Sequence, residues 1–286
     1  MKNINYFIQF ILIIFLYSLY KIIGLKSSQK ISSHIFSLLG PIFRSKKTTE
    51  KNLSKVFPLI TETEKNKIIK NVWINYGKIF SEYSFIKNFR KSKSNEMIFI
   101  ENENYLKEIK ISKKPVIFIS GHFNNFELMA MCIEKSGIDL AAIYRPLNNR
   151  FLNPLMEKIR NKYICKKQVK KGISGTREIL RHFKNGTSIA IMIDQRVSQG
   201  IKANFFGHEA LTTTIPAQFV KKFNAKIVPI YIERTKQSSF KLKIYKAIEF
   251  NKNENVSSIT LKLNKILEKM ILKNPDQWIW THNRWK

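Results

Sequence analysis

The chain opens with a long apolar segment. Residues 6–20 carry no formally charged side chain, and the apolar run continues past Lys21 as far as Leu25. About 20 apolar residues are needed to cross a bilayer, so the segment is long enough if the Lys21 ammonium group reaches the head groups. We therefore expect a membrane anchor over residues 1–25, either spanning or lying in the interface. The alternative is a helix buried in a protein core.

Helical patterns flank the middle of the chain. Thr61 and Glu64 form a capping-box pattern, and apolar residues follow at helical spacing, which predicts a helix over 62–87. An amphipathic pattern predicts another helix over 256–272. The last stretch is rich in tryptophan, and we expect at least two of these side chains to pack against the core rather than to contact lipid.

Between these helices, short apolar runs alternate with helical patterns. Helices are predicted at 126–135 and 150–163. The predicted strands are 97–100, 115–119, 139–144, 188–193, 226–232 and 240–244. Continuous apolar strands that alternate with helices are typical of a sheet covered on both faces. The predicted fold class is α/β, with a mostly parallel mixed sheet flanked by helices and an N-terminal membrane anchor helix. Residues 26–286 are expected to form one domain.

The charge of the chain narrows its partners. The 286 residues include 51 Lys and Arg against 20 Asp and Glu, a formal net charge of +31. A cationic surface attracts anionic lipid head groups, nucleic acid or acidic proteins. Biased genome composition is the alternative explanation, but it does not account for the shortage of acids. Cys132 and Cys165 fit neither a disulfide framework nor a zinc site, so we expect two ordinary core residues.

The candidate chemistry lies just after the predicted strand 115–119. Gly121 permits a sharp exit from the strand, and His122 and Glu127 follow five residues apart. A neutral imidazole can take a proton from an attacking hydroxyl group while a carboxylate holds its other ring nitrogen. We expect His122 to be the general base and Glu127 to orient it. The alternative is a surface histidine beside a helix whose glutamate interacts with the helix dipole.

Further sequence blocks follow this turn. They are Tyr144-Arg145-Pro146, residues 172–177, Asp194-Gln195, residues 205–207, residues 212–214 and residues 275–285. In order and spacing they resemble the late acyltransferases of lipid A biosynthesis, the lauroyl and myristoyl transferases of Gram-negative inner membranes. That family belongs to the lysophospholipid-type superfamily with a His-x4-Asp/Glu turn. Glycerophospholipid acyltransferases share the turn, but the glutamate of their Glu-Gly-x-x-Arg block is missing before Gly175.

The resemblance implies an activity and a set of site residues. The activity is transfer of a fatty acyl group from acyl-carrier protein to a hydroxyl of a lipid A precursor, with residues 26–286 as the catalytic domain. His122 would be the base and Glu127 the group that orients it. The residues implied to bind substrate are Arg145, Arg177, Asp194 and Gln195. A buried Arg145–Asp194 ion pair or a helix cap is the structural alternative for two of these.

The implied partners are acyl-carrier protein, an anionic phosphorylated lipid acceptor and the membrane. No cofactor is implied, and no metal is expected because no His-Glu-x-x-His pair or cysteine cluster accompanies the turn. Basic residues are more frequent just after the apolar segment than before it. The expected location is therefore the bacterial inner membrane, with the catalytic domain facing the cytoplasm.

Two other functions remain open at this point. Acyl transfer to a glycerophospholipid, an aminolipid or another glycolipid is the nearest alternative. A membrane-associated nucleic-acid-binding protein is an alternative from another class, since the net charge and the aromatic content of 12% would suit it. The apolar N-terminal segment and the lack of a nucleic-acid motif argue against that function, so no nucleic-acid partner is expected.

Overall fold

The computed structural model describes residues 2–43, 46–93, 96–235 and 239–286. Its centre is a seven-stranded sheet with the strand order β1-β9-β8-β2-β5-β3-β4. The strands are β1 (Ile98–Glu101), β2 (Ile117–Ser120), β3 (Leu140–Tyr144), β4 (Lys167–Lys170), β5 (Ser188–Met192), β8 (Ile227–Arg234) and β9 (Phe240–Ile244). Neighbours pair in parallel except β8 and β9, which are antiparallel. The predicted mostly parallel mixed sheet is confirmed.

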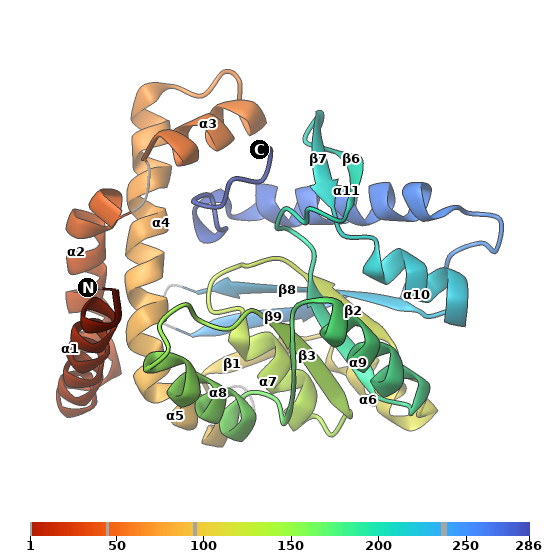
Figure 1. The fold of residues 1–286 in the computed structure, drawn as a ribbon, viewed down its shortest axis with the longest axis horizontal. Coiled ribbons are helices and arrows are strands. Elements are labelled where there is room, and N and C mark those ends of the chain that lie inside the picture. Colours follow the sequence, from red (N-terminus) through yellow and green to blue (C-terminus); the bar gives the residue numbers. More distant parts are fainter. Residues whose placement is uncertain (1, 44–45, 94–95, 236–238) are drawn as a thin grey trace.

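Helices cover both faces of this sheet. α7 (Glu127–Lys135) and α8 (Leu152–Tyr163) lie on one side, and α10 (Ile215–Phe223) and α11 (Val256–Lys273) lie on the other (Figure 1). α9 (Ile173–Lys184) packs on α10, because the Phe183 ring meets the Phe219 ring edge-on at 5.1 Å. Smaller elements are α5 (Ile86–Lys91), α6 (Glu103–Ser112) and the antiparallel hairpin of β6 (Ile201–Phe205) and β7 (His208–Thr212). Both faces of the central strands are therefore shielded from water.

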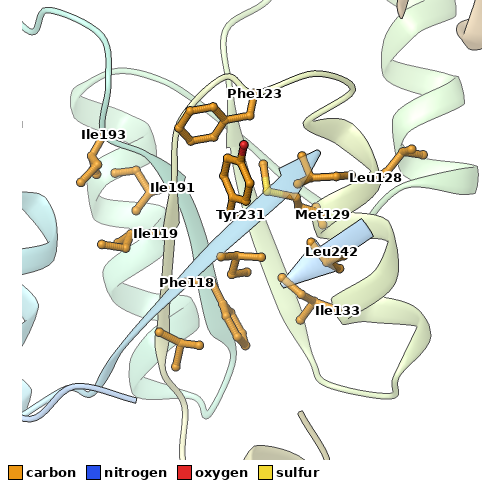
Figure 2. Packing of buried hydrophobic residues seen from close by; sticks show 14 of the residues in the cluster. Phe118, Ile119, Phe123, Leu128, Met129, Ile133, Ile191, Ile193, Tyr231 and Leu242 are labelled. Carbon is orange, nitrogen blue, oxygen red and sulfur yellow. The ribbon is translucent and has the colours of Figure 1, made fainter. Parts of the chain in front are cut away.

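The core lies between the sheet and these helices. Every residue of β2 is buried, as expected for a strand covered on both faces. Figure 2 shows Phe118 beside Ile133 of α7, and Phe123 against Tyr231 of β8. The Phe123 and Tyr231 rings meet edge-on with centroids 5.1 Å apart. This packing anchors the chain on both sides of the loop that carries His122.

The N-terminal helix lies at one edge of the molecule (Figure 1). α1 (Lys2–Ile23) contains a segment, Asn3–Ile23, that is long and apolar enough to cross a membrane. Only 6% of its most apolar stretch is buried, and Ile4, Phe15 and Ile22 are 63%, 65% and 82% exposed. A helix in a protein core would bury these residues, so the core alternative does not describe α1.

Three helices connect this edge to the sheet. They are α2 (Leu25–Phe43), α3 (Lys46–Val56) and α4 (Glu62–Glu82). α2 packs along α4, and the predicted capping box is present: Thr61 Oγ1 accepts from the Glu64 backbone N–H, and Glu64 accepts from the Thr61 backbone N–H. α4 ends at Glu82, earlier than the predicted residue 87, and a 3₁₀ turn (Tyr83–Phe85) leads into α5. This turn brings Tyr83 toward the candidate site.

Candidate active site

The strand register brings His122 and Asp194 together. β2 and β5 are parallel neighbours, and Ser120 pairs with Met192. His122 lies two residues after Ser120, and Asp194 lies two residues after Met192. The two residues therefore follow the carboxyl ends of neighbouring strands at the same level. Side chains at such neighbouring strand ends share one edge of the sheet, where open α/β sheets bind ligands.

Asp194 holds His122 with both carboxylate oxygens. Its Oδ1 lies 2.7 Å from His122 Nδ1, and its Oδ2 accepts from the His122 backbone N–H at 2.7 Å. Oδ2 also accepts from the indole N–H of Trp278 at 2.9 Å. Burial alone would raise the pKa of Asp194, but the His122 ring and these hydrogen bonds outweigh it and hold the pKa below its ordinary value. The carboxylate is therefore ionised and oriented.

The loop between β2 and α7 is shaped for this contact. A Cβ atom on Gly121 would lie 3.2 Å from Asp194 Oδ2 and 3.0 Å from Leu267 Cδ1, so any larger residue would crowd the carboxylate. Asn124 has a φ of 45°, which asparagine tolerates better than most residues. The Asn124 N–H donates to Gln277 O at 2.9 Å, which ties the loop to the C-terminal segment.

Glu127 does not contact the imidazole. It opens α7, as predicted, but its Oε1 accepts from Arg160 Nε at 2.8 Å, from Arg160 Nη2 at 2.6 Å and from Tyr83 Oη at 2.5 Å. Burial disfavours the charge of Arg160, but Glu127 and Tyr83 outweigh it and raise its pKa. The expected contact from Glu127 is made by Asp194 instead, because the parallel register places Asp194 beside His122.

The other predicted residues separate into two groups. Gln195 lines the same cavity as His122, and so does Arg145, whose Nη2 lies 3.4 Å from Asn148 Oδ1. Arg145 is exposed and Asp194 is fully buried in other contacts, so the Arg145–Asp194 ion pair is not formed.

Arg177 lies in a separate depression on α9 and α10, lined also by Arg181, Lys184 and Lys222. The structure does not bring Arg177 into the cavity that holds His122.

The C-terminal segment completes the site, and sequence reasoning missed this role. Trp278 and Trp280 are 1% and 0% exposed, which confirms the prediction that at least two tryptophans pack in the core. Trp278 also donates to Asp194, and His282 Nε2 accepts from the Arg196 backbone N–H at 3.0 Å. Burial lowers the pKa of His282 to about 4, so this ring is neutral near pH 7.

Two cavities meet at His122. We call the first the anchor-side cavity; its volume is about 280 Å³, and its walls include Tyr17, Ile79, Phe80, Leu147, Leu152 and Met156. The second is the sheet-edge cavity, of about 650 Å³, and its walls include Ala142, Arg145, Lys170, Lys171, Ala190 and Gln195. The residues that line both are His122, Phe126, Arg160 and Ile279. His122 is thus reachable from two sides.

The two cysteines stand apart from this chemistry. Cys132 and Cys165 are buried and unpaired, as expected for core residues, and burial raises the pKa of each thiol to about 12. Within the described residues, no group of three His, Cys, Asp or Glu side chains could hold a metal ion.

The fold is α/β, and it places a histidine–carboxylate pair at the sheet edge between two cavities. Comparison with known sequences shows that this is the site of an acyltransferase family. The chain belongs to the bacterial lipid A biosynthesis acyltransferase family, whose model matches residues 1–286.

Individual relatives agree with the family. The chain is 24% identical to a lipid A biosynthesis palmitoleoyltransferase of Escherichia coli (strain K12) over 269 residues, which cover 90% of this chain and 84% of the relative. It is 26% identical to a lipid A biosynthesis acyltransferase of Haemophilus influenzae over 257 residues, 88% of this chain and 81% of the relative. A lipid A biosynthesis lauroyltransferase of E. coli is 24% identical over 261 residues, 85% and 79% of the two chains.

Proposed function

We propose that this protein transfers a fatty acyl group from an acyl-carrier-protein thioester to a hydroxyl of a phosphorylated lipid A precursor. The observation that carries the proposal is the His122–Asp194 pair at the junction of two cavities, in a chain of the lipid A acyltransferase family. The E. coli relatives are named for palmitoleoyl and lauroyl transfer, which supports a fatty acyl group as the transferred unit.

The chemistry follows from the tautomer of His122. An ionised carboxylate only accepts hydrogen bonds, so the contact from Asp194 keeps a proton on Nδ1 and leaves Nε2 as the basic nitrogen. Nε2 takes the proton of the acceptor hydroxyl while the hydroxyl oxygen attacks the thioester carbonyl carbon. The C–S bond then breaks, and the imidazolium gives its proton to the leaving thiolate. An ester and a free thiol result, with no further reactant.

Charge supports an anionic donor at the sheet-edge cavity. Arg145, Lys170 and Lys171 line it, and the whole chain carries +31. Acyl-carrier protein is acidic and carries its acyl chain on a phosphate-linked arm, so a cationic entrance favours its approach. The same positive charge also attracts the phosphate groups of the acceptor lipid.

The test is a transfer assay with purified protein, a fatty acyl-carrier-protein thioester and a tetraacyl phosphorylated disaccharide lipid. Mass spectrometry should detect the lipid with one more ester-linked acyl chain, and His122→Ala protein is the control. Transfer to a lysophospholipid but not to the disaccharide lipid would overturn the acceptor assignment. Transfer only from a donor other than the carrier protein would overturn the donor assignment.

The proposal includes a place in the bacterial inner membrane, with the catalytic domain on the cytoplasmic side. The exposed apolar face of α1 supports it. After a high-salt wash the protein should stay with the membranes, because hydrophobic insertion is insensitive to salt. Release into the soluble phase together with nucleic acid would contradict this location and favour the nucleic-acid alternative.

A further inference from the structure

The two cavities at His122 differ in the chemistry of their walls. The anchor-side cavity is lined mainly by apolar and aromatic side chains. Of the described residues in its lining, the one Lys or Arg is Arg160, which is paired with Glu127. The sheet-edge cavity adds Arg145, Lys170, Lys171 and several amide side chains. A paired guanidinium attracts an external anion far less than a free one. The anchor-side cavity therefore suits an uncharged hydrocarbon segment.

The cavities also differ in their position relative to the apolar helix. Tyr17 of α1 forms part of the anchor-side wall, whereas the outward face of the same helix exposes large apolar residues. The start of α8, which forms another wall, is tied to α1. The Asn149 side chain donates to Tyr6 O at 2.8 Å, and the rings of Phe7 and Phe151 meet edge-on at 5.5 Å. A chain entering from a bilayer around α1 would reach this cavity with little exposure to water.

We infer that the anchor-side cavity binds the hydroxyl-bearing acyl chain of the acceptor lipid, while the sheet-edge cavity receives the donor acyl group. This inference rests on the proposed function and adds the direction from which each substrate arrives. The hydroxyl oxygen and the thioester carbon then meet at His122, which lines both cavities. A hydroxyl close to the head-group end of its chain would lie at His122, with the remaining hydrocarbon along α4 and α8.

Matched substitutions separate the two cavities. Ile79→Trp fills the anchor-side cavity from α4, and Leu147→Trp narrows it at a position that is 36% exposed and tolerates a larger side chain. The control is Ala142→Leu, which narrows the sheet-edge cavity alone. Each variant is compared with wild-type protein by circular dichroism and by initial rates with each substrate varied in turn.

Both anchor-side variants should raise KM for the lipid acceptor about tenfold or more, and change KM for the acyl-carrier protein less than about twofold. Ala142→Leu should show the opposite pattern, with poorer use of the longest acyl donors. An unchanged acceptor KM in a folded Ile79→Trp or Leu147→Trp protein would overturn the inference. A rise in the donor KM in these two variants would also overturn it, by placing the donor chain on the anchor side.

If the wild-type protein makes no product, that result counts against the proposed function alone. A binding experiment then still tests where the lipid chain binds. The probe is a phosphorylated disaccharide lipid whose 3-hydroxyacyl chain ends in a diazirine. After illumination, labelled peptides should come from α1, α4 or α8, and Ile79→Trp should reduce their labelling. Labels confined to β3, β5 and α9, around the sheet-edge cavity, would contradict the assignment.

Discussion

Two buried carboxylates lie close to the same histidine, and they have different surroundings. Among the described residues, Asp194, just after β5, receives hydrogen bonds from His122 and Trp278 alone. Glu127, at the start of α7, is bound by Arg160 and Tyr83. One acid is thus positioned to act on the imidazole, and the other joins α7, α8 and the turn after α4. Proximity in sequence to a histidine is therefore a weaker guide to its partner than strand register.

The largest expected effect is at the base itself. His122→Ala should lower the transfer rate about 10²–10⁴-fold, because the acceptor hydroxyl loses the group that takes its proton. Circular dichroism should be unchanged, since His122 lies in a loop and is partly exposed. Product formation is measured by mass spectrometry. A folded variant with wild-type turnover would remove His122 from the mechanism.

Glu127 should matter more for stability than for chemistry. Glu127→Gln leaves the Arg160 guanidinium buried without its counter-charge, and breaking a buried pair in this way costs about 3 kcal/mol. Denaturant unfolding in detergent measures the change. Glu157→Gln is a matched control, because Glu157 receives a 2.5 Å hydrogen bond from Tyr144 on the same side of the sheet but is less buried. Equal stability of the Glu127→Gln and wild-type proteins would show that the pair is not structural.

A substitution at Trp278 tests whether the hydrogen bond from the C-terminal segment helps to hold Asp194 in place. Trp278→Phe keeps an aromatic ring in the core but removes the N–H that donates to Asp194 Oδ2. Loss of a hydrogen bond to a charged group is worth about 1.5–3 kcal/mol, so kcat should fall about tenfold or more. The acidic limb of the pH–rate profile should also shift, because the carboxylate is less well held. Trp285→Phe, whose indole donates to Phe205 O, is the control.

The smallest expected effect is a pH dependence of stability. The folded protein keeps His282 neutral down to about pH 4, while in the unfolded chain its pKa returns to the ordinary 6.5. Between these values the unfolded state binds more protons, so stability falls as pH drops from about 6.5 toward 4. Partial exposure limits the effect to about 1–2 kcal/mol. His282→Gln should flatten this part of the stability curve in denaturant titrations at pH 7 and pH 5, and an identical slope would contradict the assignment.

Much of the fold could be predicted, because apolar runs reveal buried strands directly. The strands around Phe118 and Ile191 were predicted within a few residues, and so was the capped start of α4. The edge strand β4 was not, because its sequence Lys-Gln-Val-Lys is mostly polar and only Val169 is buried. The hairpin of β6 and β7 was not predicted either; each of its strands is short and buries only two of its five residues.

The candidate site was predicted only in part. The local sequence pattern predicts His122 and the ends of the strands. The pairing of β2 with β5 depends on packing between distant parts of the chain, so local pattern does not predict it. The family resemblance implies only substrate binding for Asp194. Its contact with His122 follows from the pairing of β2 with β5, which the sequence does not reveal. Trp278 lies 84 residues beyond Asp194 in the chain, so no local pattern could connect the two.

The most direct test of the account compares the two isosteric amide variants, Asp194→Asn and Glu127→Gln, in the same transfer assay. Rates are expressed per folded molecule, so that differences in stability do not enter. We predict that Asp194→Asn lowers kcat about 10²-fold, because an amide no longer stabilises the imidazolium or selects the Nδ1–H tautomer. Glu127→Gln should lower it less than about tenfold. A larger loss in Glu127→Gln than in Asp194→Asn would contradict the assignment of Asp194 as the positioning residue for His122.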